Sequence, residues 1–183
     1  MNFLIVGFPR LRFQKQLQKS LLSFPVSVND DVLQKCFDFW ELLLQWNSAH
    51  NLTSISDTFS AIDLHFSDSF SPLLFKDLFF NGAKVLDFGT GGGFPGIPLS
   101  FYFKNCDFTL LDKSRKKISF LSYAASLLHA ENVKCIKGNI LDDIVSDRCD
   151  VVLTRAVKID SEIFKALSNT ISKGGCLIIF YSG

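Results

Sequence analysis

The sequence lacks the cysteine and histidine patterns that bind metal ions. Its five cysteines stand at positions 36, 106, 135, 149 and 176, with no CxxC pair and no cluster of the three histidines beside them. This spacing argues against a metal site and against covalent catalysis by cysteine. We therefore expect no bound metal. We also expect reduced and mostly buried thiols, because free cysteine is among the most buried residue types.

Long apolar runs are also missing. No run approaches the roughly 18 to 20 residues that a helix needs to cross a bilayer. Residues 1–10, MNFLIVGFPR, are apolar, but no basic residue precedes the apolar run and no small-residue cleavage site follows it. A signal peptide is therefore not predicted. We expect a cytoplasmic protein that does not insert into a membrane.

Net charge is small as well. A formal charge of +1 lacks the strongly basic balance that would by itself indicate a nucleic-acid-binding protein. The apolar fraction of 48% and the twenty phenylalanines instead indicate a packed core. At 183 residues, the chain is long enough for one α/β domain with an appendage.

The first part of the chain, residues 1–82, has helical patterns. Apolar residues recur at spacings of three and four in segments 11–24 and 29–50, and Asn29 is predicted to cap the second segment. A third helix is predicted from near Asp57 to about Phe70. A helical unit of this size would be marginally stable alone. Residues 1–82 are therefore expected to form a helical appendage packed on the core.

From residue 83 onward, predicted strands alternate with predicted helices, and Gly174-Gly175 is the predicted turn into the last strand. This alternation indicates an α/β fold with a parallel-type sheet and helices on both faces. The chain stops directly after the last strand. Residues 83–183 are therefore expected to form the core, with its final strands missing and a C-terminus that is cropped or unusually short. The predicted strands cover 83–87, 107–112, 133–136, 149–154 and 175–181, and the predicted helices 95–103, 114–129 and 159–171.

One stretch, KVLDFGTGGGFPGIP from Lys84 to Pro98, organises this core. Its apolar start is predicted to be a buried strand with Asp87 at the carboxyl end. The glycines at positions 89, 91 and 93 then form a turn without side chains, against which a ligand can lie. Pro95 and Pro98 suit the first turn of a following helix. The stretch therefore predicts a site for a nucleotide-like cofactor.

The glycine spacing favours S-adenosylmethionine over a dinucleotide. A dinucleotide fingerprint needs a third glycine at position 94, which is Phe94 here. The pattern D-x-G-x-G-x-G from Asp87 to Gly93 is instead that of class I methyltransferases. Asp112 ends the second strand. Its carboxylate can accept hydrogen bonds from both hydroxyls of a ribose, and it can also cap the next helix. Asn139 is either an acceptor for the adenine amino group or a simple turn residue.

After the fourth strand comes Thr154-Arg155-Ala156. This segment has neither the Asn/Asp-Pro-Pro-aromatic pattern of many exocyclic amine methyltransferases nor a Cys beside a Pro. A target atom with a free lone pair, such as guanine N7, needs no proton removal. Catalysis can then be mostly orientation and electrostatics, with Arg155 donating to the base or to the cofactor.

Five segments together match one protein family in order along most of the chain. They are WNSAHNLTSISD (Trp46–Asp57), HFSDS (His65–Ser69), LDFGTGGGFPGIPLS (Leu86–Ser100), LLDKSRKKISFL (Leu110–Leu121) and TRAV (Thr154–Val157). Through them the chain resembles the bacterial small-subunit rRNA guanine-N7 methyltransferases, the glucose-inhibited division protein B family. The resemblance implies a Rossmann-like class I S-adenosylmethionine-dependent methyltransferase that modifies a guanosine in the decoding-region loop of 16S rRNA.

The resemblance also assigns site residues. It implies cofactor contacts at Gly89 and Phe94 in addition to the other turn residues, Asp87, Gly91 and Gly93. It places Arg155 at the point of methyl transfer. It implies an adenine site at Ile140 and Leu141 and a substrate face at His65, Asp68 and Ser69, although His65 also fits a hydrogen-bonded residue at a helix interface. Lys113, Arg115 and Lys116 are further candidates for the substrate side, or they form an ordinary solvated helix face.

Three departures from the family pattern remove charge that could hold RNA. Asn139 and Leu141 stand where the family usually has Arg and Glu, Ser182-Gly183 stand where it tends to have Lys-Gly, and the family's final strands are absent. The leading prediction is a monomeric rRNA methyltransferase whose partner is 16S rRNA or the small ribosomal subunit. The alternatives are a cofactor-binding protein of this fold with weakened or lost activity, and a class I methyltransferase for another substrate.

Overall fold

Five strands form one parallel sheet in the order β3-β2-β1-β4-β5. The computed structural model describes residues 10–24, 27–55, 57–142, 145 and 147–181, so the predictions for residues 1–9 and for Ser182-Gly183 lie outside the described residues. Every neighbouring pair of strands is parallel, as the alternating pattern predicted. The strands are β1 (Lys84–Phe88), β2 (Asp107–Asp112), β3 (Val133–Lys137), β4 (Cys149–Arg155) and β5 (Ile171–Phe180).

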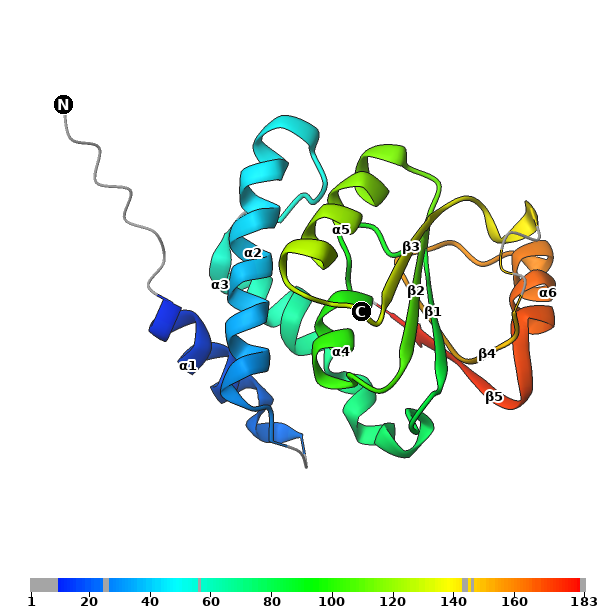
Figure 1. Ribbon diagram of the computed structural model, residues 1–183, viewed down its shortest axis with the longest axis horizontal. Coiled ribbons are helices and arrows are strands. Elements are labelled where there is room, and N and C mark those ends of the chain that lie inside the picture. The colour runs from blue at the N-terminus through cyan, green and yellow to red at the C-terminus, as the bar shows by residue number, and fades with distance from the viewer. Residues whose placement is uncertain (1–9, 25–26, 56, 143–144, 146, 182–183) are drawn as a thin grey trace.

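Helices cover both faces of the sheet (Figure 1). Helices α4 (Gly96–Tyr102) and α5 (Arg115–Leu127) lie on one face, and α6 (Ser161–Thr170) lies on the other. The strands therefore alternate between two apolar cores: Val85 of β1 belongs to the larger core on the α4 and α5 side, and its neighbour Leu86 to the smaller core on the α6 side. This is the fold of class I methyltransferases, a Rossmann-like sheet whose strand order reverses between β1 and β4.

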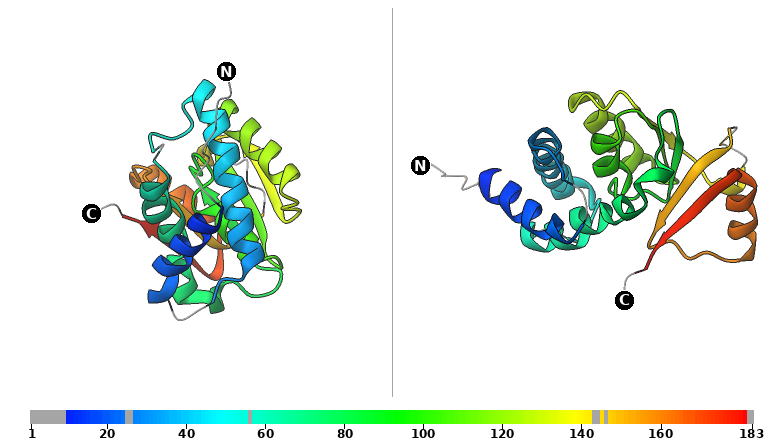
Figure 2. Two further views of the ribbon diagram at one scale, coloured as in Figure 1. Left: turned by 90° about the vertical axis from the view of Figure 1, so that its left-hand side faces the viewer. Right: turned by 90° about the horizontal axis from the view of Figure 1, so that it is seen from below.

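The N-terminal helices add a further layer outside α4 and α5 (Figures 1 and 2). Helix α2 is capped as predicted, because the Asn29 side chain accepts from the Val32 N–H at 3.0 Å. The layer joins the core through Phe39, whose ring centroid lies 5.5 Å from that of Phe94 and 5.8 Å from that of Phe120. Its elements are α1 (Arg10–Ser20), η1 (Leu21–Ser23), α2 (Asp30–His50), α3 (Thr58–Ala61), η2 (Ile62–Ser67) and η3 (Ser71–Leu78).

The predicted third helix is not regular. Helix α3 begins directly after its cap, Asp57, which accepts from the Ser60 N–H at 2.8 Å. The chain then continues as the π-helical segment η2, a wider turn that is frequent at functional sites.

The start of β5 and the cap of α5 also differ from the prediction. Strand β5 starts at Ile171, directly after α6, and not at 175. Gly174, with a φ of 88°, lies inside the strand, where the pairing with β4 shifts register between Cys149 and Val151. The glycines therefore form an irregularity within the strand and not the turn before it. Helix α5 is capped by Ser114 and not by Asp112.

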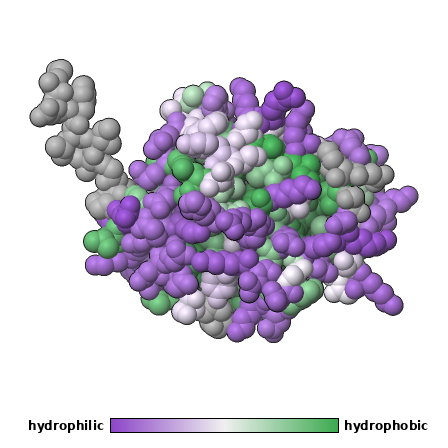
Figure 3. Space-filling view, in the orientation of Figure 1, coloured by the Kyte–Doolittle hydropathy of each residue, from purple (hydrophilic) through white to green (hydrophobic). Residues whose placement is uncertain are grey.

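Polar side chains cover much of the face seen in Figure 3, and the apolar side chains lie mostly inside. The five cysteines are free thiols, as predicted, and burial raises the pKa of the Cys36 thiol. Among the described helices, none combines the length and apolar character needed to cross a bilayer. Within the described ranges, His, Cys, Asp and Glu residues do not gather in groups of three or more that could hold a metal ion.

The packing of Phe39 predicts that the appendage and the core unfold as one unit. Phe39→Ala should lower the free energy of unfolding by about 3–5 kcal/mol, because the fully buried ring bridges the two parts. Urea unfolding followed by far-UV circular dichroism and by fluorescence of Trp40 and Trp46, which both lie in α2, should give coincident transitions. Leu22→Ala, at a side chain that is 78% exposed, is the control and should change stability by less than about 0.5 kcal/mol. Separate transitions for the two probes would contradict the prediction.

Candidate active site

The predicted glycine turn follows β1 and uses its glycines in two ways. Gly89, Gly91 and Gly93 all have positive φ, of 73°, 59° and 100°. A Cβ at Gly93 would lie 2.7 Å from Leu121 Cδ2, and a Cβ at Gly89 would collide with the Val157 side chain. A Cβ at Gly91 would meet nothing within 3.8 Å. Gly89 and Gly93 therefore allow close packing, whereas a Cβ at Gly91 would make only ordinary contacts with its neighbours.

Asp87 lies beneath this turn. Its side chain is fully buried, and Oδ2 accepts from Thr90 Oγ1 at 2.7 Å and from the Gly96 N–H at 2.9 Å. Burial raises the pKa of the Asp87 carboxyl to about 6. These contacts tie the end of β1 to the turn and to the start of α4. The other oxygen, Oδ1, is buried without a hydrogen-bond partner among the described residues.

A first cavity, of about 460 Å³, opens beside the turn at the carboxyl ends of β1 and β2, and we call it the turn cavity. Asp112 forms part of its wall and accepts from the Gly91 N–H at 3.0 Å and from the Ser114 N–H at 2.8 Å. Lys117 Nζ lies 3.8 Å from the same carboxylate. The lining residues are Phe88, Gly89, Leu111, Asp112, Lys113, Lys117, Gly138, Asn139, Ala156, Val157, Lys158 and Ile163.

A second cavity, of about 650 Å³, lies between the ends of β4 and β5 and the appendage, and we call it the Arg155 cavity. It shares Ala156 with the turn cavity, so the two adjoin at the end of β4. Ala156 has a φ of 56°, a conformation that is uncommon for a residue with a side chain. The lining residues are Ser54, Ile55, Asp63, Leu64, His65, Asp68, Arg155, Ala156, Phe180 and Tyr181.

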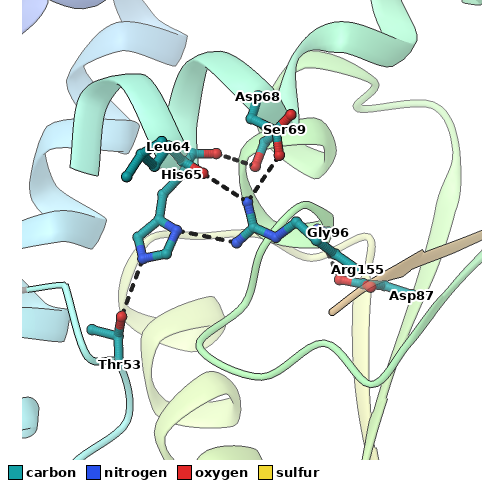
Figure 4. Close-up of polar contacts among 8 residues, drawn as sticks. All are labelled: Thr53, Leu64, His65, Asp68, Ser69, Asp87, Gly96 and Arg155. Carbon is teal, nitrogen blue, oxygen red and sulfur yellow. Dashed lines mark hydrogen bonds and ion pairs between the residues drawn. The ribbon is translucent and has the colours of Figure 1, made fainter. Parts of the chain in front are cut away.

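Arg155 is held by the appendage (Figure 4). One terminal nitrogen donates to the Leu64 carbonyl at 3.1 Å and to Asp68 Oδ2 at 3.2 Å, and the other lies 3.2 Å from His65 Nδ1. The guanidinium carbon also lies 5.5 Å from the centroid of the Phe94 ring. Three acceptors from a single helical segment therefore fix the guanidinium in the wall of the Arg155 cavity.

The protonation of His65 follows from its neighbours. Burial, together with the positive charge of Arg155, lowers the pKa of His65 from 6.5 to about 4, so the ring is neutral near pH 7. An arginine can only donate, so Nδ1 must accept and Nε2 must carry the proton. That proton points to Thr53 Oγ1 at 3.1 Å. The ring is stacked on Phe94 with its centroid 4.5 Å away and an angle of 15° between the planes.

Seven of the site residues predicted from the sequence line one of the two cavities. Gly89, Asp112, Asn139 and Lys113 line the turn cavity, and His65, Asp68 and Arg155 line the second cavity. Sequence reasoning assigned no site role to several lining residues, although three of them, Lys117, Val157 and Ile55, lie inside matched segments. They include Lys117, Val157 and Lys158 in the turn cavity and Ile55, Asp63, Leu64 and Tyr181 in the Arg155 cavity.

Other predicted residues lie elsewhere. Phe94 is packed under the His65 ring and is 3% exposed. Ser69 is fully buried and donates to the His65 carbonyl, so it supports the backbone of η2. Ile140 and Leu141, in η4 (Ile140–Asp142), line a separate cavity beside α6. Arg115 and Lys116 are exposed in the first turn of α5.

Comparison with known proteins gives one consistent family. Residues 32–183 match the family described as rRNA small subunit methyltransferase G. A protein of that name from Coxiella burnetii is 34% identical over 165 residues, which cover 90% of this chain and 79% of the relative. A second, from Lachnoclostridium phytofermentans, is 31% identical over 169 residues, which cover 90% of this chain and 69% of the relative.

A solved structure supports the fold. The S-adenosylmethionine-dependent methyltransferase of Geobacter sulfurreducens, crystallised with S-adenosylhomocysteine, aligns with a TM-score of 0.53 at 19% identity. The alignment covers 76% of this chain and 54% of that chain. At this low sequence identity the alignment supports only the fold. The parallel sheet described above is consistent with that fold.

The neighbours of His65 predict a histidine that resists protonation. Nuclear magnetic resonance titration should find a pKa of about 4 for His65, with the proton on Nε2 at pH 7. Folding then excludes a proton that the unfolded chain would bind below pH 6.5, so the free energy of unfolding should fall as the pH drops from about 6.5 toward 4. Arg155→Ala should raise this pKa but leave it below 6.5, because burial is the larger cause. A His65 that titrates near 6.5 in the folded protein would contradict this description of the site.

Proposed function

This chain belongs to the rRNA small subunit methyltransferase G family, and from that premise and the two adjoining cavities we propose that it methylates N7 of a guanosine in 16S rRNA. The methyl donor is S-adenosylmethionine, and the target is a guanosine in the decoding-region loop. The observation that carries the proposal is the junction at Ala156, where a cavity beside the glycine turn meets a cavity that contains a fixed arginine. From the proposed rRNA target we infer a cytoplasmic location. Its monomeric state stays a prediction.

The turn cavity suits the cofactor. Its volume of about 460 Å³ lies in the usual range of small-molecule sites, and Gly89 of the glycine turn belongs to its lining. We assign Gly89 and Gly91 to the backbone cradle, Asp112 to the ribose hydroxyls and Asn139 to the adenine amino group. Bound S-adenosylmethionine supplies a methyl group on a positively charged sulfur.

Residues that line neither cavity are assigned supporting roles. Asp87 Oδ1 and Thr154 Oγ1 are buried without hydrogen-bond partners among the described residues. They lie at the carboxyl ends of the adjacent strands β1 and β4. Asp87 and Gly93 are packed inside the protein. We therefore propose that they maintain the conformation of the glycine turn and do not contact the cofactor. We propose that Phe94 supports the wall of the Arg155 cavity. We propose that Ile140 and Leu141 pack behind Asn139.

The Arg155 cavity suits a base that has left its stack. Leu64 and Tyr181 line it and are 58% and 86% exposed, so apolar surface is available to a base near the mouth. Guanine N7 has a free lone pair, so the reaction needs no general base. The described contacts use three of the five N–H groups of Arg155, which leaves donors for the base. Asp68 and His65 hold Arg155 during the reaction.

Basic residues at the rim fit an RNA backbone. Lys113, Lys117 and Lys158 line the mouth of the turn cavity, and Arg115 and Lys116 follow on the exposed side of α5. Phosphate contacts of this kind supply much of the affinity of RNA-binding proteins, and they weaken as salt increases. We assign Lys113, Arg115 and Lys116 to the phosphates that flank the target.

The decisive experiment is transfer of labelled methyl groups to 16S rRNA that lacks the modification, followed by mass-spectrometric mapping of the product. We expect one 7-methylguanosine in the decoding-region loop. Arg155→Lys should lower kcat/KM at least about tenfold, because a lysine cannot bond three acceptors in the arginine geometry. Tight binding of S-adenosylmethionine without any transfer would favour a cofactor-binding protein that has lost activity. Methylation of another atom or RNA would identify a different substrate.

The position of Asp112 predicts a cofactor-specific variant. Asp112→Asn should weaken S-adenosylmethionine binding about tenfold in isothermal titration calorimetry, because a charged acceptor for the ribose hydroxyls is lost. Asp107→Asn, at the exposed start of the same strand, should bind the cofactor like the wild-type protein. Equal affinity for the cofactor in the two variants would show that Asp112 serves only to hold the backbone N–H groups of Gly91 and Ser114.

A further inference from the structure

The segment Trp46–Asp57 matched the family in sequence, yet neither methyl-donor binding nor the chemistry of N7 gives it a role. In the structure it ends α2 and leads to α3. Asn51 ends α2 in the left-handed conformation, with a φ of 50°. The Asn47 side chain then accepts from the Thr53 N–H at 2.9 Å. The loop is thus folded back on the last turn of α2, which fixes the position of Thr53.

The hydroxyl of Thr53 contacts both the loop and the site. Its oxygen accepts from the Ile55 N–H at 3.1 Å and lies 3.1 Å from His65 Nε2. Since Nε2 carries the proton, Thr53 is the acceptor for His65. Ile55, the next residue but one, lines the Arg155 cavity. One hydroxyl therefore connects the wall of that cavity to the imidazole.

The imidazole has few ways to move. Its face is held by stacking on Phe94, so the remaining motion is rotation of the ring within its plane or a flip about the Cβ–Cγ bond. The hydrogen bond at Nε2 opposes both motions and keeps Nδ1 directed at Arg155. A flipped ring would present carbon to the guanidinium. Arg155 would then have one partly buried donor without an acceptor, which is costly.

We propose, on the premise of the methyl transfer proposed above, that Thr53 is a positioning residue for Arg155 and acts through His65. Its hydroxyl oxygen anchors Nε2–H, Nδ1 therefore accepts from the guanidinium, and Arg155 is held in the wall of its cavity, one residue before the junction at Ala156. Thr53 itself is absent from the linings of both cavities. It sets the geometry of the reaction without contacting the base or the cofactor.

The test compares Thr53→Val, which keeps the shape and removes the acceptor, with Thr53→Ser, which keeps the hydroxyl. Methyl transfer to 16S rRNA is measured at saturating S-adenosylmethionine and RNA. Thr53→Val should lower kcat about fivefold to tenfold, the effect of one hydrogen bond, and Thr53→Ser should stay within about twofold of the wild-type rate. Both variants should bind S-adenosylmethionine with unchanged affinity, because Thr53 lies outside the turn cavity.

A second readout does not depend on activity. The Nε2–H resonance of His65 in ¹H–¹⁵N spectra should be visible in the wild-type protein and in Thr53→Ser. It should be lost to solvent exchange in Thr53→Val, while the urea midpoint shows that the variant is folded. This measurement separates loss of the anchor from general destabilisation of the loop.

The outcomes separate the two proposals. A wild-type protein that fails to methylate 16S rRNA would overturn the proposed function, and the catalytic role of Thr53 with it. An active wild-type protein with an equally active Thr53→Val variant would overturn the inference alone. Equal loss in the valine and serine variants would also overturn it, because the hydroxyl would not be the group that matters. A His65 Nε2–H signal that persists in Thr53→Val would remove its physical basis.

Discussion

The positive charge of Arg155 is the constraint on which the candidate site depends. The side chain is only 17% exposed, and a guanidinium in that position needs acceptors to replace the water it has lost. The core strands end at this point, so their backbones provide none of the three acceptors described. The appendage provides them all, from Leu64, His65 and Asp68. Leu64 and His65 lie in the π-helical segment η2, and Asp68 is its C-terminal cap, so a carbonyl and two side chains from one short segment reach a single guanidinium.

The same contacts explain why the appendage is part of the site. Two of the three groups that hold Arg155 are neutral, and one is a carboxylate 3.2 Å away. A carboxylate alone would fix the charge at one point. The carbonyl and the imidazole fix the plane of the guanidinium as well, which determines where its remaining N–H groups point. The helical layer thus does more than cover α4 and α5.

Much of the fold could be predicted from the sequence, because its signals are local. Strand periodicity, the cap at Asn29 and glycines that need positive φ each act within a few residues, and the structure confirms them. The π-helical turn has no local signal in the sequence, and the early start of β5 depends on pairing with β4, so neither could be predicted. A motif located Arg155 and Asp112. The motif HFSDS contained His65 and Asp68, but no motif showed that they hold Arg155, because they come from a segment about 90 residues earlier in the chain.

Asp87 shows that the role of a residue inside a motif also cannot be predicted from the sequence alone. The pattern identified it, but sequence spacing does not tell whether a carboxylate at a strand end faces the ligand or the turn. Its hydrogen bonds to Thr90 and Gly96 show that it faces the turn. Thr53 lay in a matched segment without a role, and only the fold brings its hydroxyl to His65.

Phe94 explains why this turn departs from the dinucleotide pattern. In a dinucleotide fold, the third glycine allows close packing of helix and strand. Here the ring at that position packs edge-on against Phe39 and Phe66, at 5.5 and 5.1 Å, and stacks on His65. It therefore joins the core to the appendage and at the same time supports the ring that holds Arg155. A glycine would lose both functions, so the residue that distinguishes this turn from a dinucleotide site is also the one that connects stability to the geometry of the site.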